Sequence, residues 1–295
     1  MKQTKVLTYV TRFFLMAVLL LPAAAAAGSL WQWQMSLEVE KVGDAMYMPS
    51  AVAFDKEAER YYVVDTGQSR LVSFGRDGKL VKAFTANGQL KSPFDMVRLD
   101  NGQLWVVEKG RNSLTHIDIP GKTVTTNTLH DGERLVFPDR LAVSKGKLHV
   151  LDRSSGQVLR LNADLSVEQR FGCQDCSAGL FDFVLVDDSV VALEPRDKRI
   201  YQFRPDGTVD REINLGDEVG FPVSLAVGPS GFFYVLDRHV NNIVAYDQGG
   251  KFRYRFLSSG SIPGKIFYAR ELRFDPWGQL CVVDEGNGRV EVYSH

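Results

Sequence analysis

The stretch that most constrains the fold lies at the end of the chain, at residues 279–293. Residues 280–283 form a short apolar run that ends at the carboxylate of Asp284, and residues 285–288 form a polar turn that contains glycine. Residues 289–293 then alternate polar and apolar side chains. This order is typical of a β-hairpin. The same pattern occurs five more times upstream, so the hairpin is one unit of a repeat.

Six carboxylates, each at the end of the second strand of a copy, align the repeats. They are Asp65, Glu108, Asp152, Glu194, Asp237 and Asp284, and they lie 43, 44, 42, 43 and 47 residues apart. A four-stranded antiparallel unit of short strands needs about 40–45 residues, which is the period of a propeller blade. The sequence therefore predicts an all-β protein, with one six-bladed β-propeller over residues 28–295.

The first and last copies leave two features unmatched. Residues 30–40 alternate with a period of two and so are typical of a strand, but they have no hairpin partner nearby. The sixth copy ends at residue 295 without a fourth strand. A ring of blades leaves an unpaired strand edge where its two ends meet. We expect residues 30–40 to be the outer strand of the sixth blade and to close the ring.

The copies resemble NHL repeats, whose consensus runs from Pro and small residues through Val-Ala-Val-Asp to Val-x-Asp, a Gly-Asn-His-like turn, Arg-Ile and an aromatic residue. Residues 49–55 (Pro-Ser-Ala-Val-Ala-Phe-Asp) and 62–74 carry this pattern in the first copy. The last copy keeps Asp284-x-Gly286-Asn287-x-Arg289-Val290. The copies depart from it where Gln68-Ser69 replaces Asn-His and where Glu108 and Glu194 replace aspartates.

This resemblance covers residues 30–295 and implies an exported bacterial-type NHL protein with a TolB-like six-bladed propeller. Similar six-bladed proteins include an amidating lyase, gluconolactonase-like hydrolases and a streptogramin lyase. These enzymes use histidine or acidic side chains around the mouth of the channel. The chain has only five histidines, and His239 is the one in a turn on the expected mouth side.

The N-terminus has the order of a secretory signal. Lys2, Lys5 and Arg12 precede the apolar residues 13–21, and a proline and an alanine tract follow. The 15 residues from 13 to 27 are short for a membrane-spanning helix, which leaves an uncleaved anchor as the alternative. We expect residues 1–27 to be removed. The product is then periplasmic or secreted, with no stable membrane insertion.

Charge restricts the partners that we expect. Residues 1–27 carry three basic groups and no acidic ones, so their removal changes the formal net charge from −1 to −4. A mildly acidic domain without a block of Lys and Arg offers no electrostatic reason for binding nucleic acid or an anionic membrane. We expect a monomer that binds no nucleic acid.

The pair Cys173 and Cys176 has the Cys-x-x-Cys spacing. Covalent haem needs a histidine at the next position, where Ser177 stands, and zinc needs a second pair. In an oxidising compartment such a pair favours a local disulfide, and a redox accessory role is the alternative. Cys281 aligns with Tyr and Trp of other copies and is expected to be a buried thiol.

Candidate ligand-binding residues lie where the inner strands begin, at the expected mouth of the channel. They are Asp95, Asp139, Arg140, Asp182, Arg270 and Glu271, together with His239. Converging carboxylates could hold Ca²⁺ and the arginines could orient a ligand. Alternatively, each aspartate bonds the amides of its own turn. No other cofactor is expected. The insertion at residues 257–265 is expected to overhang the mouth as a partial lid.

These features favour a non-catalytic propeller that binds a protein, peptide or glycan through its mouth loops, because the sequence shows no nucleophile–base signature. One alternative is a divalent-metal-dependent hydrolase or lyase of lactonase type that uses the carboxylate rim. A second is a redox accessory protein that uses the cysteine pair.

Overall fold

The computed structural model describes residues 30–41, 43–174 and 176–295. The expected signal at residues 1–27 lies outside the described residues. Residues Trp31–His295 form one compact unit. No helix within the described ranges is long and apolar enough to cross a membrane. The helical turns found there are the 3₁₀ turns η1 (Ala86–Gly88) and η2 (Gly216–Glu218).

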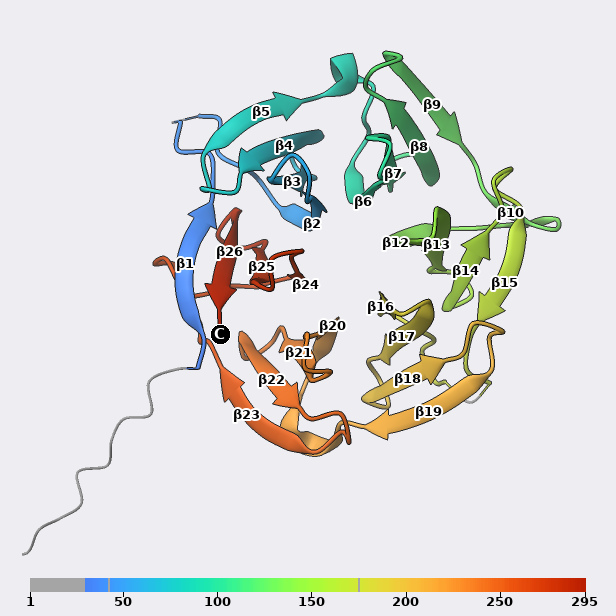
Figure 1. The fold of residues 1–295 in the computed structure, drawn as a ribbon, viewed down its shortest axis with the longest axis vertical. Coiled ribbons are helices and arrows are strands. Elements are labelled where there is room, and N and C mark those ends of the chain that lie inside the picture. The colour runs from blue at the N-terminus through green and yellow to red at the C-terminus, as the bar shows by residue number, and fades with distance from the viewer. Residues whose placement is uncertain (1–29, 42, 175) are drawn as a thin grey trace, which may run out of the picture. The chain divides into compact units, whose positions relative to one another are not determined.

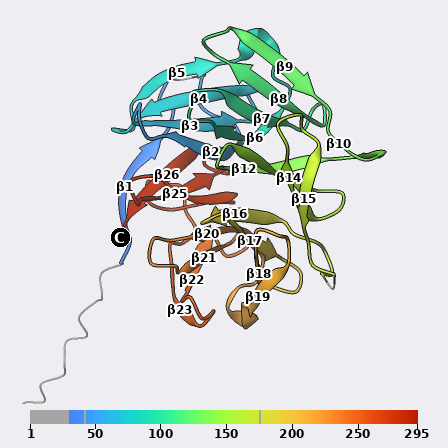
Figure 2. The same ribbon diagram turned by 45° about the vertical axis from the view of Figure 1, so that its right-hand side comes forward.

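The described strands build six four-stranded antiparallel sheets, which are arranged as the blades of a β-propeller (Figure 1, Figure 2). Blade 1 contains β2 (Pro49–Asp55), β3 (Arg60–Asp65), β4 (Arg70–Gly75) and β5 (Leu80–Phe84). Blade 2 contains β6 (Pro93–Arg98), β7 (Leu104–Glu108), β8 (Ser113–Asp118) and β9 (Thr123–Asn127). Blade 3 contains β12 (Pro138–Ser144), β13 (Lys147–Asp152), β14 (Gln157–Leu161) and β15 (Val167–Phe171).

The second half of the unit repeats this order. Blade 4 contains β16 (Asp182–Val186), β17 (Ser189–Glu194), β18 (Arg199–Phe203) and β19 (Val209–Asn214). Blade 5 contains β20 (Pro222–Val227), β21 (Phe233–Asp237), β22 (Asn242–Tyr246) and β23 (Phe252–Phe256). Blade 6 contains β24 (Glu271–Phe274), β25 (Leu280–Asp284), β26 (Arg289–Ser294) and β1 (Gln32–Leu37). A small hairpin of β10 (His130–Asp131) and β11 (Arg134–Leu135) joins blades 2 and 3.

Strand β1 closes the ring, as the sequence predicts. It pairs antiparallel with β26, from Gln32 opposite Ser294 to Leu37 opposite Val290. Beyond these backbone bonds, the buried carboxylate of Glu291 on β26 accepts a hydrogen bond from Trp33 Nε1 at 2.6 Å and one from Ser36 Oγ at 2.8 Å. The closure therefore joins the two ends of the repeat by both backbone and side-chain contacts.

The hydrophobic core lies between neighbouring blades rather than at one centre. Six buried clusters each combine side chains from two adjacent sheets. Between blades 1 and 2, for example, Ala51 and Val64 pack with Met96 and Val106. This one-dimensional packing is what a repeat architecture predicts, since each blade buries its faces only against its neighbours.

The six aligned carboxylates hold the loops that connect the blades. Asp65 accepts the backbone N–H of Tyr47 at 2.9 Å, Asp152 that of Phe137 at 2.9 Å, and Asp284 that of Phe267 at 2.8 Å. Glu108, Glu194 and Asp237 accept equivalent N–H groups from the loops before their own blades. The carboxylates are therefore structural. All six carboxylates accept an N–H group from the loop that precedes their blade. Bonds to the turn that follows the carboxylate come in addition to this contact.

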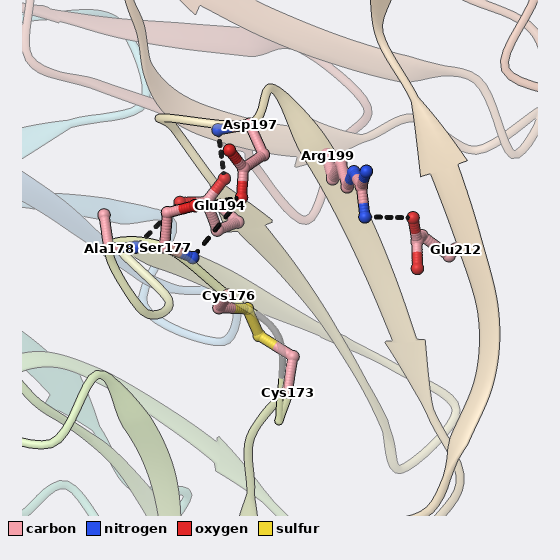
Figure 3. The surroundings of a disulfide bond; sticks show 8 residues. All are labelled: Cys173, Cys176, Ser177, Ala178, Glu194, Asp197, Arg199 and Glu212. Atoms are coloured by element: carbon pink, nitrogen blue, oxygen red, sulfur yellow. Dashed lines mark hydrogen bonds and ion pairs between the residues drawn. A yellow bond between two sulfur atoms is a disulfide. The ribbon is translucent and has the colours of Figure 1, made fainter.

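Cys173 and Cys176 form a disulfide in the loop that connects blades 3 and 4, with their Cα atoms 5.4 Å apart (Figure 3). The same loop is fastened to blade 4, because Ser177 Oγ donates to Asp197 at 2.6 Å and the Ala178 N–H donates to Glu194 at 3.2 Å. Cys281 is a buried free thiol. The disulfide and the buried thiol are both confirmed.

Candidate functional site

The strand register shows which residues of the inner strands share one level of the channel. The residues at this level each pair with the residue that precedes the aligned carboxylate of their blade. They are Ala51, Asp95, Arg140, Asp182, Ser224 and Glu271. We call the polar members of this level, together with Arg273 two residues further along β24, the belt.

Asp139 does not share this level with Asp95 and Asp182, although all three lie where an inner strand begins. The pairing of β12 with β13 is irregular between Pro138 and Arg140, and this irregularity puts Arg140 in the belt. Asp139 lies one residue nearer the mouth. The same irregularity follows Pro49, Pro93 and Pro222 in other blades.

The belt carboxylates connect consecutive inner strands, whose channel-facing edges have no neighbouring strand. Glu271 of blade 6 accepts the N–H of Val52 in blade 1 at 2.8 Å. Asp95 accepts that of Leu141 in the next blade at 2.8 Å, and Asp182 accepts that of Leu225 at 2.9 Å. Ser224 Oγ accepts the Leu272 N–H at 3.0 Å. These bonds satisfy buried backbone donors that would otherwise be unpaired.

Two arginines complete the belt. Arg140 Nη1 lies 3.3 Å from Glu271 Oε1, and Arg273 Nη2 lies 3.1 Å from the same oxygen and 3.2 Å from Asp182 Oδ1. Although burial opposes ionisation, the ion pairs with Arg273 and Arg140 hold the pKa of Asp182 below its ordinary value. Burial raises the pKa of Asp95 to about 7, and the nearby charge of Glu271 adds to this effect.

These carboxylates do not fit a Ca²⁺ site. Every oxygen of Asp95, Asp182 and Glu271 already accepts an amide, a hydroxyl or an arginine, because Asp95 Oδ1 accepts the Met96 N–H at 2.7 Å. Ca²⁺ needs six to eight oxygen ligands, so it would have to displace these donors. Across the described ranges, no group of three or more His, Cys, Asp or Glu side chains is placed to hold a metal ion.

A cavity of about 210 Å³ opens above the belt at the mouth of the channel, and we call it the mouth cavity. Its described lining is Phe94, Lys109, Asp139, Arg140, Arg153, Phe181, Phe221, Val223, Arg238 and Arg270. Five of these side chains are basic and one is acidic. Below the belt lies a second, larger cavity of about 340 Å³ with mostly apolar walls.

The mouth cavity is built from two recurring positions of the repeat. The residue just before the belt level supplies Phe94, Asp139, Phe181, Val223 and Arg270. The residue just after the aligned carboxylate supplies Lys109, Arg153 and Arg238. Sequence reasoning missed this second set. The available signal was a basic residue at the same step in three of the six copies.

Lys109 contacts both a carboxylate and an aromatic ring of the cavity lining. Its Nζ is 2.5 Å from Asp139 Oδ1 and 3.1 Å from the centroid of the Phe94 ring. The pKa of Lys109 is lowered to about 8, mainly by burial, with smaller contributions from the charges of Arg270 and Arg153 and against the opposing effect of Asp139. Lys109 therefore exchanges its proton closer to neutral pH than an ordinary lysine does.

Arg270 and Arg238 share one carboxylate, since each lies 2.8 Å from Glu285 Oε2. Arg270 also stacks over Phe94, with its guanidinium carbon 4.5 Å from the ring centroid. Burial lowers the pKa of Arg270, and the charges of Arg140 and Arg238 add to this effect. More cations than carboxylates surround the cavity, so it is suited to bind an anion.

His239 and the insertion lie outside the cavity lining. The exposed ring of His239 stacks on Phe221, with centroids 4.3 Å apart and planes 7° apart. The expected lid is wrong, because residues 257–265 are fastened to β26 of blade 6. There, Ile262 O accepts from Arg289 at 2.9 Å and the Gly264 N–H donates to Glu291 at 3.2 Å.

No protein-family model matches the sequence. Solved structures similar to this chain include a streptogramin B lyase, with a TM-score of 0.65 and 12% identity over 90% of this chain and 97% of that chain. A virginiamycin B lyase from Staphylococcus aureus has a TM-score of 0.64 and 13% identity, covering 90% and 99%. A gluconolactonase from Xanthomonas campestris has a TM-score of 0.65 and 17% identity, covering 89% and 98%. At these identities the likeness establishes the propeller fold.

Proposed function

We propose that the mouth cavity binds a small molecule that carries a carboxylate or a similar anionic group. We further propose that the protein is an enzyme of lyase or lactonase type that acts on this molecule. The observation that carries the proposal is the lining of the cavity, which has five basic side chains, one acidic side chain and three phenylalanine rings. Two further carboxylates outside the lining pair with three of the cations, Glu285 with Arg270 and Arg238 and Glu271 with Arg140, so cations remain in excess. Such a site offers charge to an anionic group and apolar walls to the rest of the ligand.

Two observations support an enzyme over a simple binding protein. The structurally similar proteins are lyases and a lactonase. In addition, the pKa of Lys109 is lowered to about 8, so this side chain can act as a general base near neutral pH. Arg270 and Arg238 could stabilise the negative charge that develops on an oxygen when a proton is removed next to a carbonyl or when a lactone opens.

Binding is tested first, with a panel of aliphatic, aromatic and hydroxylated carboxylates measured by thermal shift and calorimetry. Arg270→Ala should weaken binding of the best probe by roughly tenfold or more, as expected for a lost charge-assisted contact. Arg255→Ala is the matched control, because Arg255 also pairs with a carboxylate and stacks on a phenylalanine, but on an outer strand. The proposal is wrong if no carboxylate binds, or if both variants behave alike.

Activity is tested next with lactones and with carboxylates that bear a leaving group next to an acidic C–H. Lys109→Met should abolish turnover while leaving the melting temperature within a few degrees, because Lys109 lies at the cavity surface with a side chain 28% exposed. Turnover by the wild-type protein should rise with pH and show an apparent pKa near 8, since the base must be unprotonated.

The second candidate is a non-catalytic protein that binds an anionic peptide or glycan at the same mouth. Phe137, Phe181 and Phe221 favour it, because they are large apolar side chains left exposed by the loops of three blades. Exposed apolar side chains that cluster on one face often mark a binding surface. This candidate predicts that Arg270→Ala reduces binding, while no substrate in the panel is turned over.

We also propose that the blades are NHL repeats and that the protein is exported as a monomer to the periplasm or beyond. The repeat pattern and the order of residues 1–27 support this. The disulfide between Cys173 and Cys176 is the state expected in an oxidising compartment. Intact mass and N-terminal sequencing of the protein recovered from cells should show that residues 1–27 are removed. A measured reduction potential of the pair would test the redox alternative.

A further inference from the structure

Lys109 is surrounded by groups that favour a reactive amine. Among the described residues that line the mouth cavity it is the only lysine. Its Nζ lies against the face of Phe94 at 3.1 Å, and the guanidinium of Arg270 lies 4.5 Å from the same ring. Lysines that are desolvated in a pocket beside other cations are the ones that proteins use as nucleophiles toward carbonyl carbons.

We propose that Lys109 forms an imine with the carbonyl carbon of a small oxo acid whose carboxylate is held by Arg270 and Arg238. This inference rests on the proposed anion site and adds the class of its ligand. The geometry supports it because the amine and the arginines border one cavity of about 210 Å³, room for a small oxo acid. A molecule with neighbouring carboxylate and carbonyl groups would meet the arginines and the amine at the wall of the same cavity.

Asp139 is placed to move the protons of this reaction, since its Oδ1 lies 2.5 Å from Lys109 Nζ. The carboxylate of Asp139 takes one proton from the ammonium, and the freed lone pair attacks the carbonyl carbon. The carbonyl electron pair moves to oxygen, which receives a second proton from the nitrogen to give a carbinolamine. Asp139 then returns its proton to the hydroxyl group, water leaves, and the nitrogen lone pair forms the C=N bond of a protonated imine.

The overall step consumes one ammonium and one carbonyl and yields one protonated imine and one water, so it requires no oxidant or reductant. Burial and the charges of Arg270 and Arg153 hold the pKa of Lys109 at about 8. The fraction of free amine at neutral pH is therefore far larger than for a lysine with the ordinary value of 10.5. The site thus combines a carboxylate clamp, an available amine and an adjacent proton carrier.

The test is reductive trapping of the folded, full-length protein with pyruvate and cyanoborohydride, read by intact mass and peptide mapping. Lys109 should carry the reduced adduct at a level roughly tenfold or more above exposed lysines, because more of its amine is free. Lys79 is the matched control, since it also pairs with an aspartate, Asp77, at 2.8 Å but lies on an exposed turn.

Three further arms define the ligand class. Lys109→Met should lose the adduct at this position, and Arg270→Ala should reduce it without changing labelling of Lys79. Acetone, a ketone without a carboxylate, should label Lys109 much less than pyruvate does. The melting temperature of each variant shows whether it is folded, and the comparison of Lys109 with Lys79 in wild type needs no variant.

The outcomes separate the two proposals. Labelling of Lys109 no greater than that of Lys79, in protein that still binds carboxylates through Arg270, overturns the imine and leaves the anion site standing. Equal labelling by pyruvate and acetone overturns the oxo-acid class. Absence of both carboxylate binding and labelling overturns the anion site and the imine together.

Discussion

Burial in the channel wall strongly changes the pKa of one residue, Asp95. Its side chain is 3% exposed, and burial raises its pKa to about 7 from the ordinary value of 3.8. The folded protein therefore holds this proton more tightly than the unfolded chain does. The resulting stabilisation is complete below about pH 4 and is lost as the pH rises through about 7.

We predict that Asp95→Asn becomes more stable relative to wild type as the pH rises from 4 to 8. The amide cannot ionise. Asp95 accepts the backbone N–H groups of Met96 and Leu141, and the amide carbonyl of the variant can still accept one of the two. Urea unfolding at pH 4.5, 6 and 7.5 measures the effect. Asp77→Asn, on an exposed turn, should show no such relative gain. A constant difference between Asp95→Asn and wild type would mean that Asp95 does not titrate in this range.

Lys109 was not identified as a site residue from the sequence, because its environment is set by the fold. A lysine that follows a strand-ending carboxylate is usually a solvated surface residue, and nothing next to it in the sequence marks it as half-buried. Its environment depends on Phe94, Asp139 and Arg270, which come from three different blades. Only the ring arrangement brings these together. Residue chemistry at the mouth thus depends on contacts that are distant in sequence.

At the scale of the element, the repeat was easy to recognise, but the registers were not. The strands, the six-blade count and the closing role of β1 follow from periodic patterns of apolar and turn residues. The irregular pairing after Pro93 and Pro138 shifts residues by one step, and the apolar pattern does not show it, although a proline precedes it in four blades. Arg140, and not Asp139, therefore holds the belt position of blade 3. The insertion failed as a lid because Arg289 and Glu291, on β26, hold it.

We predict that the protein depends on β1 and on the carboxylate that fastens it. Removing residues 31–40 takes Trp31, Leu37 and Val39 out of two core clusters, at about 1.5–3 kcal/mol for each large side chain, and exposes the edge of β26. The shortened chain should be insoluble or melt far below the full chain. Melting within a degree or two of the full chain would refute closure by β1.

A point substitution tests the same junction. Glu291→Ala leaves Arg289, 2.6 Å away, without this partner, so the free energy of unfolding should fall by about 3–5 kcal/mol. Glu212→Ala is the matched control, because Glu212 pairs with Arg199 at 2.6 Å on an exposed outer strand. Its effect should stay below about 1 kcal/mol. Equal effects would show that the buried pair does not fasten β1.

We predict that the disulfide is dispensable for folding. It joins residues only three apart in sequence, so its chain-entropy stabilisation lies below the roughly 3 kcal/mol expected for a 15-residue loop. The bonds of Ser177 and Ala178 to Asp197 and Glu194 would still hold the loop in place (Figure 3). The double substitution Cys173→Ser, Cys176→Ser should melt within a few degrees of wild type. Failure of this variant to fold would contradict the prediction.

At the scale of the whole molecule, the belt connects blades that are not neighbours. Arg140 of blade 3 lies 3.3 Å from Glu271 of blade 6, across the channel. We predict that Arg140→Ala lowers the free energy of unfolding by about 3–5 kcal/mol, because it leaves buried carboxylates unpaired. Urea unfolding measures this, with the exposed Arg255→Ala as control. A change below about 1 kcal/mol would show that the belt is not a structural tie.

The candidate site was also predicted only in part from the sequence. The sequence predicted that the starts of the inner strands meet around the channel, and the structure places Asp95, Arg140, Asp182 and Glu271 in direct or shared contacts there. The sequence could not predict that the carboxylates of the belt already accept hydrogen bonds from amides and arginines. Whether an acidic group at a strand start is free depends on the next blade, whose position no local pattern specifies.

The closure by β1 has a consequence for how the protein is made. Among the described strands, β1 leaves the ribosome first and its partner β26 leaves last. The leading strand must therefore stay unpaired through the synthesis of all five complete blades, and the propeller cannot close until β26 has left the ribosome. A premature stop that removes only β26 would also release the beginning of the chain. The first and the last described strands thus depend on each other for their pairing.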